Sequence, residues 1–213
     1  MTQLIPPKAP NMPLSPAMPD RLYMDQLTNA QRLYYNKIDN VLQTLFNIRG
    51  GAYLSYPYAA IQRTTDKTFT ATNTATQITF DTNDFLSGCT NDGTDGIHVD
   101  VAGIYNYQFS VQLKNTDTQI HSAWIWLRVN GVDVTGTGSK FDVISSHGGT
   151  PGFVIAACNF YVELQAGDYV EMWAAVDNTA VTFDATTAST SPFAMPSIPS
   201  VVATLSFVSA LTA

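Results

Sequence analysis

The sequence predicts a mainly β protein that begins with an extended segment and one long helix. Charged residues make up only 13% of the 213 residues, which is about half the usual share. Thr, Asn, Ser, Gly and aromatic residues are abundant instead, and they favour short strands and turns. From Thr68 onward, apolar runs alternate with Gly, Asn and Asp, which is the pattern of a β-sandwich or barrel.

Residues 7–19 carry a proline at every third position. Proline at this density excludes a helix interior and a central strand. A period of three places the rings along one edge of a polyproline II helix. Two interpretations are open, a stiff disordered spacer or an arm that docks in grooves of a larger assembly. We predict an anchor arm over 1–19, with the anchor residues Pro7, Pro10, Pro13, Pro16 and Pro19.

One long helix is predicted over 20–49. Asp20 is a typical N-cap residue, and no Gly or Pro follows until Gly50 and Gly51. Apolar residues recur at alternating spacings of three and four, which favours a coiled coil. Leu33 and Leu42 broaden this stripe, as they would in a helix lying on its own domain. The seam positions are Met24, Leu27, Gln31, Tyr34, Ile38, Val41, Leu45 and Ile48.

The remaining chain is predicted as a Tyr-rich connector over 50–67 and a β domain over 68–213. Strict alternation over 104–113 points Tyr105, Tyr107, Phe109, Val111 and Leu113 to one core face. In "AWIWLRV" (123–129), Trp124 and Trp126 face away from Ala123, Ile125 and Leu127. Residues 153–164 are likewise apolar on both sides. Because a sandwich sheet has one inner face, a second apolar face predicts self-association.

Charge is unevenly distributed along the chain. Residues 1–67 hold seven Lys/Arg against four Asp, a net +3, whereas residues 68–213 hold three Lys/Arg against thirteen Asp/Glu, a net −10. An acidic body is repelled by phosphate backbones and anionic lipid, so we expect neither a nucleic-acid nor a membrane partner. The N-terminus lacks a signal-peptide pattern, and two cysteines, Cys89 and Cys158, are too few for a disulfide framework. We expect reduced thiols and assembly in a cytoplasm.

Sequence motifs for catalysis, phosphate binding and metal binding are incomplete in this chain. Gly131 and Gly136 have phosphate-loop spacing, but Thr137 stands where lysine is needed, which favours a turn. "SSHGG" (145–149) has no nucleophile elbow. "NDGTDG" (91–96) could bind calcium but is more typical of a hairpin turn. The two glutamates, Glu163 and Glu171, leave a polysaccharide hydrolase as the third hypothesis. We expect no enzyme, cofactor or metal.

Histidines and tryptophans leave two binding interpretations open. His98, His121 and His147 could form rings around a symmetry axis that bind an ion, with His121 and His147 the better candidates, although hydrogen-bonded surface histidines are more usual. Trp124, Trp126 and Trp173 could stack on a glycan, although core or interface positions are more usual for strand tryptophans.

Three motifs in the β domain resemble one known family. They are "AGIYNYQFSVQL" (102–113), "VELQAGDYVEMW" (162–173) and "VVATLSFVS" (201–209). They look like the jelly-roll head of complement component one q and the tumour necrosis factor family, with Tyr107 in place of the usual phenylalanine. The resemblance implies a trimeric jelly-roll sandwich over 68–213. Together with the heptad seam of the helix and the doubly apolar strand at 123–129, it predicts a trimer interface that contains Leu27, Tyr34, Ile38, Val41, Leu45, Ile48, Trp124 and Trp126.

Over about 20–209 the chain also resembles small structural proteins of tailed-phage virions, frequent in marine and cyanobacterial phages. The segments that carry this likeness are "DRLYMDQLTNAQRLYYNKIDN", "GGAYLSYPYAAIQ" and "VAGIYNYQFSVQLKNTDTQIHSAWIWLRVNG". The resemblance implies a non-enzymatic virion protein, a homotrimeric fibre or head decoration whose arm binds capsid, portal, adaptor or tail proteins. The alternative is an adhesion module that binds a host glycan or receptor.

Overall fold

The computed structural model describes residues 10–12, 18, 20–46, 56–94 and 96–211, with side chains of the helix described up to Leu42. The chain divides between residues 55 and 56 into two compact units, which we describe separately. The first holds the helix and the second holds all described strands. The protein is therefore mainly β, as the sequence predicts.

Helix α1 spans Arg21–Phe46. It begins where predicted, because the Asp20 carboxylate accepts a hydrogen bond from the Tyr23 N–H at 2.7 Å. The Asp20 carbonyl accepts another from the Met24 N–H at 3.1 Å. These bonds satisfy amide groups that a helix start leaves without partners. The predicted end at Gly50 and Gly51 lies outside the described residues.

A stripe of half-buried side chains runs along α1. It contains Leu27, Tyr34, Ile38 and Val41, whereas Met24, Leu33 and Leu42 are exposed. The side chain of Leu45 and all of Ile48 lie outside the described part of the chain. The coiled-coil seam therefore stays a prediction. Pro10 has no regular secondary structure, and the other four anchor prolines are not described.

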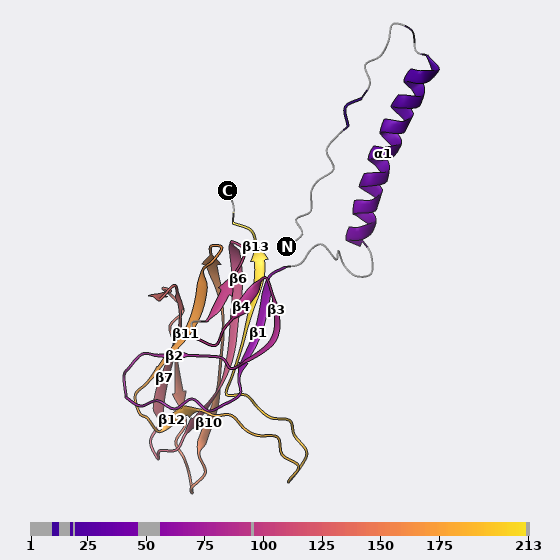
Figure 1. Ribbon diagram of the computed structural model, residues 1–213. Coiled ribbons are helices and arrows are strands. Elements are labelled where there is room, and N and C mark those ends of the chain that lie inside the picture. Colours follow the sequence, from indigo (N-terminus) through magenta and orange to yellow (C-terminus); the bar gives the residue numbers. More distant parts are fainter. Residues whose placement is uncertain (1–9, 13–17, 19, 47–55, 95, 212–213) are drawn as a thin grey trace. The chain divides into compact units, whose positions relative to one another are not determined.

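The second unit consists of two antiparallel sheets (Figure 1). The six-stranded sheet has the order β10 (Gly152–Leu164), β6 (Gly103–Asn115), β13 (Val201–Ser209), β1 (Tyr58–Arg63) and β3 (Thr82–Ser87), with β12 (Val181–Phe183) also beside β6. The seven-stranded sheet has the order β4 (Cys89–Asn91), β5 (Ile97–Val99), β11 (Tyr169–Val176), β7 (His121–Val129) and β8 (Val132–Asp133), with β2 (Thr76–Ile78) also beside β11 and β9 (Ser139–Val143) beside β7.

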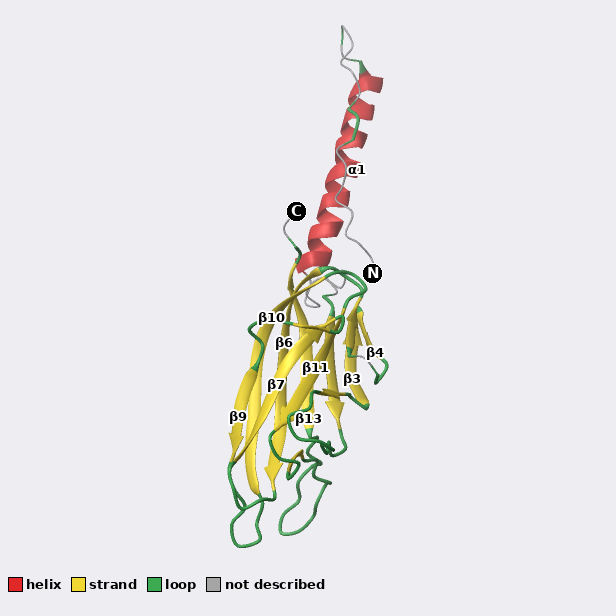
Figure 2. Cartoon of the chain, turned by 90° about the vertical axis from the view of Figure 1, so that its left-hand side faces the viewer, coloured by secondary structure: helices red, strands yellow, loops and turns green. Residues whose placement is uncertain are grey.

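The strand pairs are nested along the chain. The innermost pair is β7 with β9, followed by β6 with β10, then β2 and β5 with β11, and finally β1 with β13. Since Tyr58 pairs with Ser206, the start of β1 and the end of β13 share one end of the sandwich. The loops 116–120, 144–151 and 177–180 lie at the other end, which we call the far end (Figure 2).

The core lies between the two sheets and confirms the predicted alternation. The five inward residues of β6, from Tyr105 to Leu113, are each at most 4% exposed. They meet Ala123, Ile125 and Leu127 of β7, which are fully buried. Period-2 alternation marks these strands because each sheet has one face against the other.

The predicted connector over 50–67 is wrong for its second half. Residues 58–63 form β1, which lies between β13 and β3 within the six-stranded sheet. Only Ala59 and Ile61 of this strand are buried, and two apolar positions are too few to produce a clear period. The compact unit therefore starts at Tyr56 rather than at residue 68.

Two core tyrosines of β6 give a matched stability prediction. The Tyr105 hydroxyl donates to the Val101 carbonyl at 2.6 Å, whereas the fully buried Tyr107 hydroxyl has no partner among the described residues. A buried polar group without a hydrogen bond is destabilising. We expect Tyr107→Phe to raise the free energy of unfolding by about 1 kcal/mol and Tyr105→Phe to lower it by about as much. Denaturant titration measures both, and a loss of stability in Tyr107→Phe would contradict the prediction.

Candidate interaction surfaces

All three tryptophans of the chain lie on the outer face of the seven-stranded sheet. Trp126 of β7 and Trp173 of β11 are directly paired across the strands, and Trp124 lies one row along. All three are half-buried. The predicted orientation of Trp124 and Trp126, away from the core side of β7, is confirmed. Their predicted role at a trimer interface is untested by this geometry.

Charged side chains lie against these indole rings. The Arg128 guanidinium lies 3.9 Å from the centre of the Trp173 ring, and the Lys140 ammonium lies 5.9 Å from that of Trp124. Asp133 accepts hydrogen bonds from Arg128 Nε at 2.6 Å and from Trp126 Nε1 at 2.7 Å. These bonds, that of Arg128 first, hold the pKa of the Asp133 carboxyl below its usual value. The outer face of this sheet is therefore both aromatic and charged.

Glu171 is a structural residue of the same sheet. It is only 5% exposed, and its carboxylate accepts hydrogen bonds from Gln77 Nε2 at 3.1 Å and from the Gly131 N–H at 3.0 Å. The other glutamate, Glu163, is exposed on β10 of the six-stranded sheet. The two carboxylates that the hydrolase hypothesis requires thus lie on different sheets.

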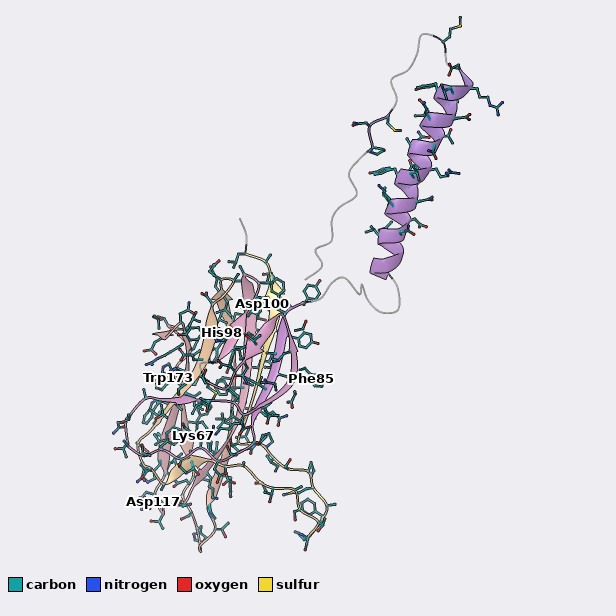
Figure 3. The ribbon with its side chains drawn as sticks, in the orientation of Figure 1. Lys67, Phe85, His98, Asp100, Asp117 and Trp173 are labelled. Atoms are coloured by element: carbon teal, nitrogen blue, oxygen red, sulfur yellow. The ribbon has the colours of Figure 1, made fainter. Side chains whose placement is uncertain are left out.

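The outer face of the six-stranded sheet has the opposite character. It exposes large apolar side chains, with Phe153, Ile155 and Tyr161 of β10 between 51% and 67% exposed and Phe85 of β3 68% exposed. Phe85 and Trp173 lie on opposite sides of the sandwich in Figure 3. Sequence reasoning missed Phe85, because "TNDFLS" (82–87) has no alternation of apolar and polar residues.

The outward side chains of this sheet form what we call the uncharged face. Alternation along the paired strands assigns to it Phe153, Ile155, Ala157, Asn159, Tyr161, Asn106, Gln108, Ser110, Gln112, Val202, Thr204, Ser206, Tyr58, Ala60, Gln62 and Phe85. Charged side chains border it at three places. Lys114, which pairs with Asp184, lies opposite Phe153, and Glu163 follows Tyr161 along β10. The Asp84 carboxylate accepts a hydrogen bond from the Gln62 side chain beside β3. This lack of charge is notable because residues 68–213 carry a net charge of −10.

Strand β10 is the terminal strand of the six-stranded sheet. All thirteen of its residues pair with β6 on one side, and the described strands provide no ladder on its other side. A long apolar edge strand is a site of association with another chain unless it is covered. The predicted second apolar face of 153–164 is thus present and joins an open sheet edge.

His121 lies at the far end between two carboxylates. Its Nε2 is 2.8 Å from Asp117 Oδ2, and its Nδ1 is 3.3 Å from Asp177 Oδ1. The imidazolium form can donate to both carboxylates, whereas the neutral ring can donate to only one. His147 is exposed in a tight turn that pairs with Thr150, also at the far end. His98 lies on β5 beside the ring of Tyr169. In the part of the chain that the structure describes, no group of three or more His, Cys, Asp or Glu side chains is arranged so that it could hold a metal ion.

The contact between His121 and Asp117 should make the free energy of unfolding depend on pH in the acid range. The hydrogen bond from His121, and next that from the Thr118 N–H, hold the pKa of the Asp117 carboxyl below its usual value. A lowered pKa in the folded state stabilises the protein above the unfolded-state value of about 3.9, and this contribution is lost as the pH falls through the folded-state value. We expect Asp117→Asn to lose less stability than the parent protein between about pH 5 and pH 2.

Unfolding curves across this pH range test the expectation, with His121→Gln as the matched variant. Because His121 is the main cause of the lowered pKa, His121→Gln should remove much of the same acid dependence. The double variant should then add little. An unchanged acid dependence in Asp117→Asn would contradict the prediction.

The motifs singled out for chemistry form turns. Asn130 (φ 50°) and Gly131 (φ 77°) join β7 to β8, as a two-residue hairpin with positive φ at both positions requires. Asn91 pairs with Ile97, so "NDGTDG" joins β4 to β5 and its hairpin interpretation is confirmed. Both cysteines are free, and burial, together with the nearby Asp100 carboxylate, raises the pKa of the Cys89 thiol to about 12.

No protein-family model matches the sequence, and no curated protein matches it. In the described part of the chain, no helix has the length and apolar character needed to cross a membrane.

Proposed function

We propose that this chain is a non-enzymatic structural protein of a bacteriophage particle, a homotrimeric fibre or head decoration assembled in the host cytoplasm. Its arm over 1–19 anchors it to capsid, portal, adaptor or tail proteins, and its β domain forms the outer knob. The observation that carries the proposal is the uncharged face, which ends at the open edge of β10.

Self-association explains this face better than a soluble monomer does. Copies with a net charge of −10 over 68–213 repel one another, and this repulsion is smallest when the surfaces that meet carry no charge. Interface cores are poor in charged residues and rich in aromatic ones, and the uncharged face supplies Tyr58, Phe85, Phe153 and Tyr161. Contact between copies also covers the β10 edge.

The nested strand pairing supports the jelly-roll part of the proposal. Four nested antiparallel pairs, distributed over two sheets, are what results when one long hairpin is rolled into a sandwich with Greek-key connections. The capped helix α1, with its half-buried stripe, supports a short stalk between the arm and the knob.

Two measurements test the proposal. Light scattering of the purified chain should give the mass of a trimer, and a well-folded monomer at high concentration would refute the fibre interpretation. Deletion of residues 1–19 should leave a soluble trimer that no longer joins particles. Incorporation of the truncated chain would refute the anchor.

The second candidate function is a module that binds a host glycan or receptor. It is favoured by the half-exposed indoles of Trp124 and Trp126, which lie beside the hydrogen-bonding side chains of Arg128 and Asp133. Glycan arrays and adsorption assays would show binding by the parent chain that Trp126→Ala loses. Binding that survives this change would place any ligand elsewhere.

A further inference from the structure

An arm of the β domain projects from the six-stranded sheet between β12 and β13, over 184–200 (Figures 1 and 2). Its two halves are joined by paired backbone hydrogen bonds, between Thr186 and Ile198 at 2.8 Å and between Ser189 and Met195 at 2.8 and 3.1 Å. We call this segment the hairpin arm. No charged residue follows Asp184 in the sequence, so the arm beyond its first residue is uncharged.

The hairpin arm buries little of its own apolar surface. Phe193, near its tip, is 64% exposed, and Ile198, near its base, is 36% exposed. A two-stranded hairpin is at best marginally stable in water unless it packs on another element. An arm with an exposed phenylalanine and four linking hydrogen bonds therefore calls for a surface to cover it.

A groove of matching character opens at the base of the arm. It has a volume of about 370 Å³ and is lined by Phe153, Val154, Ile155 and Ile198 together with Gln112, Thr186 and Asp184. The Asp184 carboxylate is the one charged group of this lining, and it is paired with Lys114 at 2.7 Å. A cavity of about 150 Å³ is enough to hold benzene, so this groove has room for a phenylalanine ring. The Phe193 ring of the same copy does not fill it, because that ring is largely exposed.

We propose that the hairpin arm of one copy packs on the next copy and places Phe193 in the groove between Phe153 and Ile155. This inference rests on the self-association proposed above and names a contact within it. The groove is continuous with the uncharged face through Gln112, Phe153 and Ile155.

A second copy is the occupant that the charges favour. The body of the domain is strongly acidic. An uncharged arm can approach it without charge repulsion, and no charged side chain of the arm has to lose its hydration. Arm and groove are different surfaces of the same chain, so the contact is heterologous, and repeated around an axis it closes a ring.

Cross-linking of the full-length chain tests the contact. The variant carries Phe193→Cys and Ile155→Cys in a Cys158→Ser background, which removes the half-buried native thiol. Oxidation should produce covalent dimers and trimers on non-reducing electrophoresis, because a disulfide needs its two Cα atoms within about 7 Å. The matched control pairs Phe193→Cys with Val132→Cys, whose parent residue is 70% exposed on the other sheet, and should stay uncross-linked.

The outcomes separate this inference from the proposed function. The arm contact alone is overturned if the parent chain is trimeric by light scattering and the variant with cysteines at 155 and 193 forms no species cross-linked between copies. A disulfide within one copy counts as the same negative result. A monomeric parent chain overturns both. As a measurement without cysteines, Phe193→Ser should raise the concentration at which the trimer dissociates by about tenfold or more, and an unchanged value would overturn the contact.

Discussion

Replacing Ile155 by glutamate is expected to convert the oligomer into folded monomers. Ile155 is 65% exposed and lies within the uncharged face. In the proposed assembly this change buries an unpaired carboxylate in every copy, at a penalty of several kcal/mol each. The mass from light scattering should fall roughly threefold if the closed ring is a trimer. The circular dichroism spectrum should be unchanged, because this side chain is outside the core.

Val132→Glu is the matched control for this experiment. Val132 is 70% exposed and β-branched like Ile155, but it lies on β8 of the other sheet. We expect Val132→Glu to remain oligomeric. Trp124→Glu then tests the interface predicted from sequence. If Trp124→Glu dissociates the oligomer and Ile155→Glu does not, the tryptophan face is the interface and the uncharged face is not.

Phe183→Ala is expected to cause the largest loss of stability within a single copy. Phe183 is fully buried on β12, and its ring packs edge-on against Phe69 with 5.3 Å between ring centres. Its backbone exchanges hydrogen bonds with Lys67 at 2.9 and 3.0 Å, so backbone and ring contacts together join β12 to residues 67–69. Removing a buried phenylalanine ring costs about 3–5 kcal/mol.

Denaturant unfolding of the Ile155→Glu monomer background measures this loss without a contribution from association. Ile120→Ala serves as the control, because Ile120 is 64% exposed in a far-end loop and surface changes are usually within about 0.5 kcal/mol. A loss below about 1 kcal/mol for Phe183→Ala would mean that the site collapses around the smaller side chain.

Several elements follow from local sequence alone. Asp20 marks the start of α1 because its short carboxylate can reach the free amides of the first turn. The inward residues of β6 are readable because one face of the strand is buried along its whole length. The turn at Asn130 and Gly131 follows from residues that tolerate positive φ.

Other features depend on segments that are distant in the sequence. The uncharged face combines outward residues of five strands. Only the pairing of these strands shows that the outward side chains lying across the sheet between Phe85 and Tyr161 carry no charge. The contact of His121 with Asp177 joins the first residue of β7 to the loop that follows β11 at the far end. The groove beside Phe153 exists only because the hairpin arm leaves the sheet at Asp184.

By itself, the sequence determined the β class, the start of the helix, the turns and the core-facing residues of β6. Each of these depends on the torsion preferences or the periodicity of neighbouring residues. The tertiary structure alone decided that residues 58–63 are a strand, that the tryptophans lie beside Arg128 and Lys140, and that the opposite face is uncharged. The physical reason is that contacts between distant segments decide which strands pair and which side chains stay exposed. Backbone hydrogen bonds can join any two aligned strands, so no local sequence pattern shows which strands will pair.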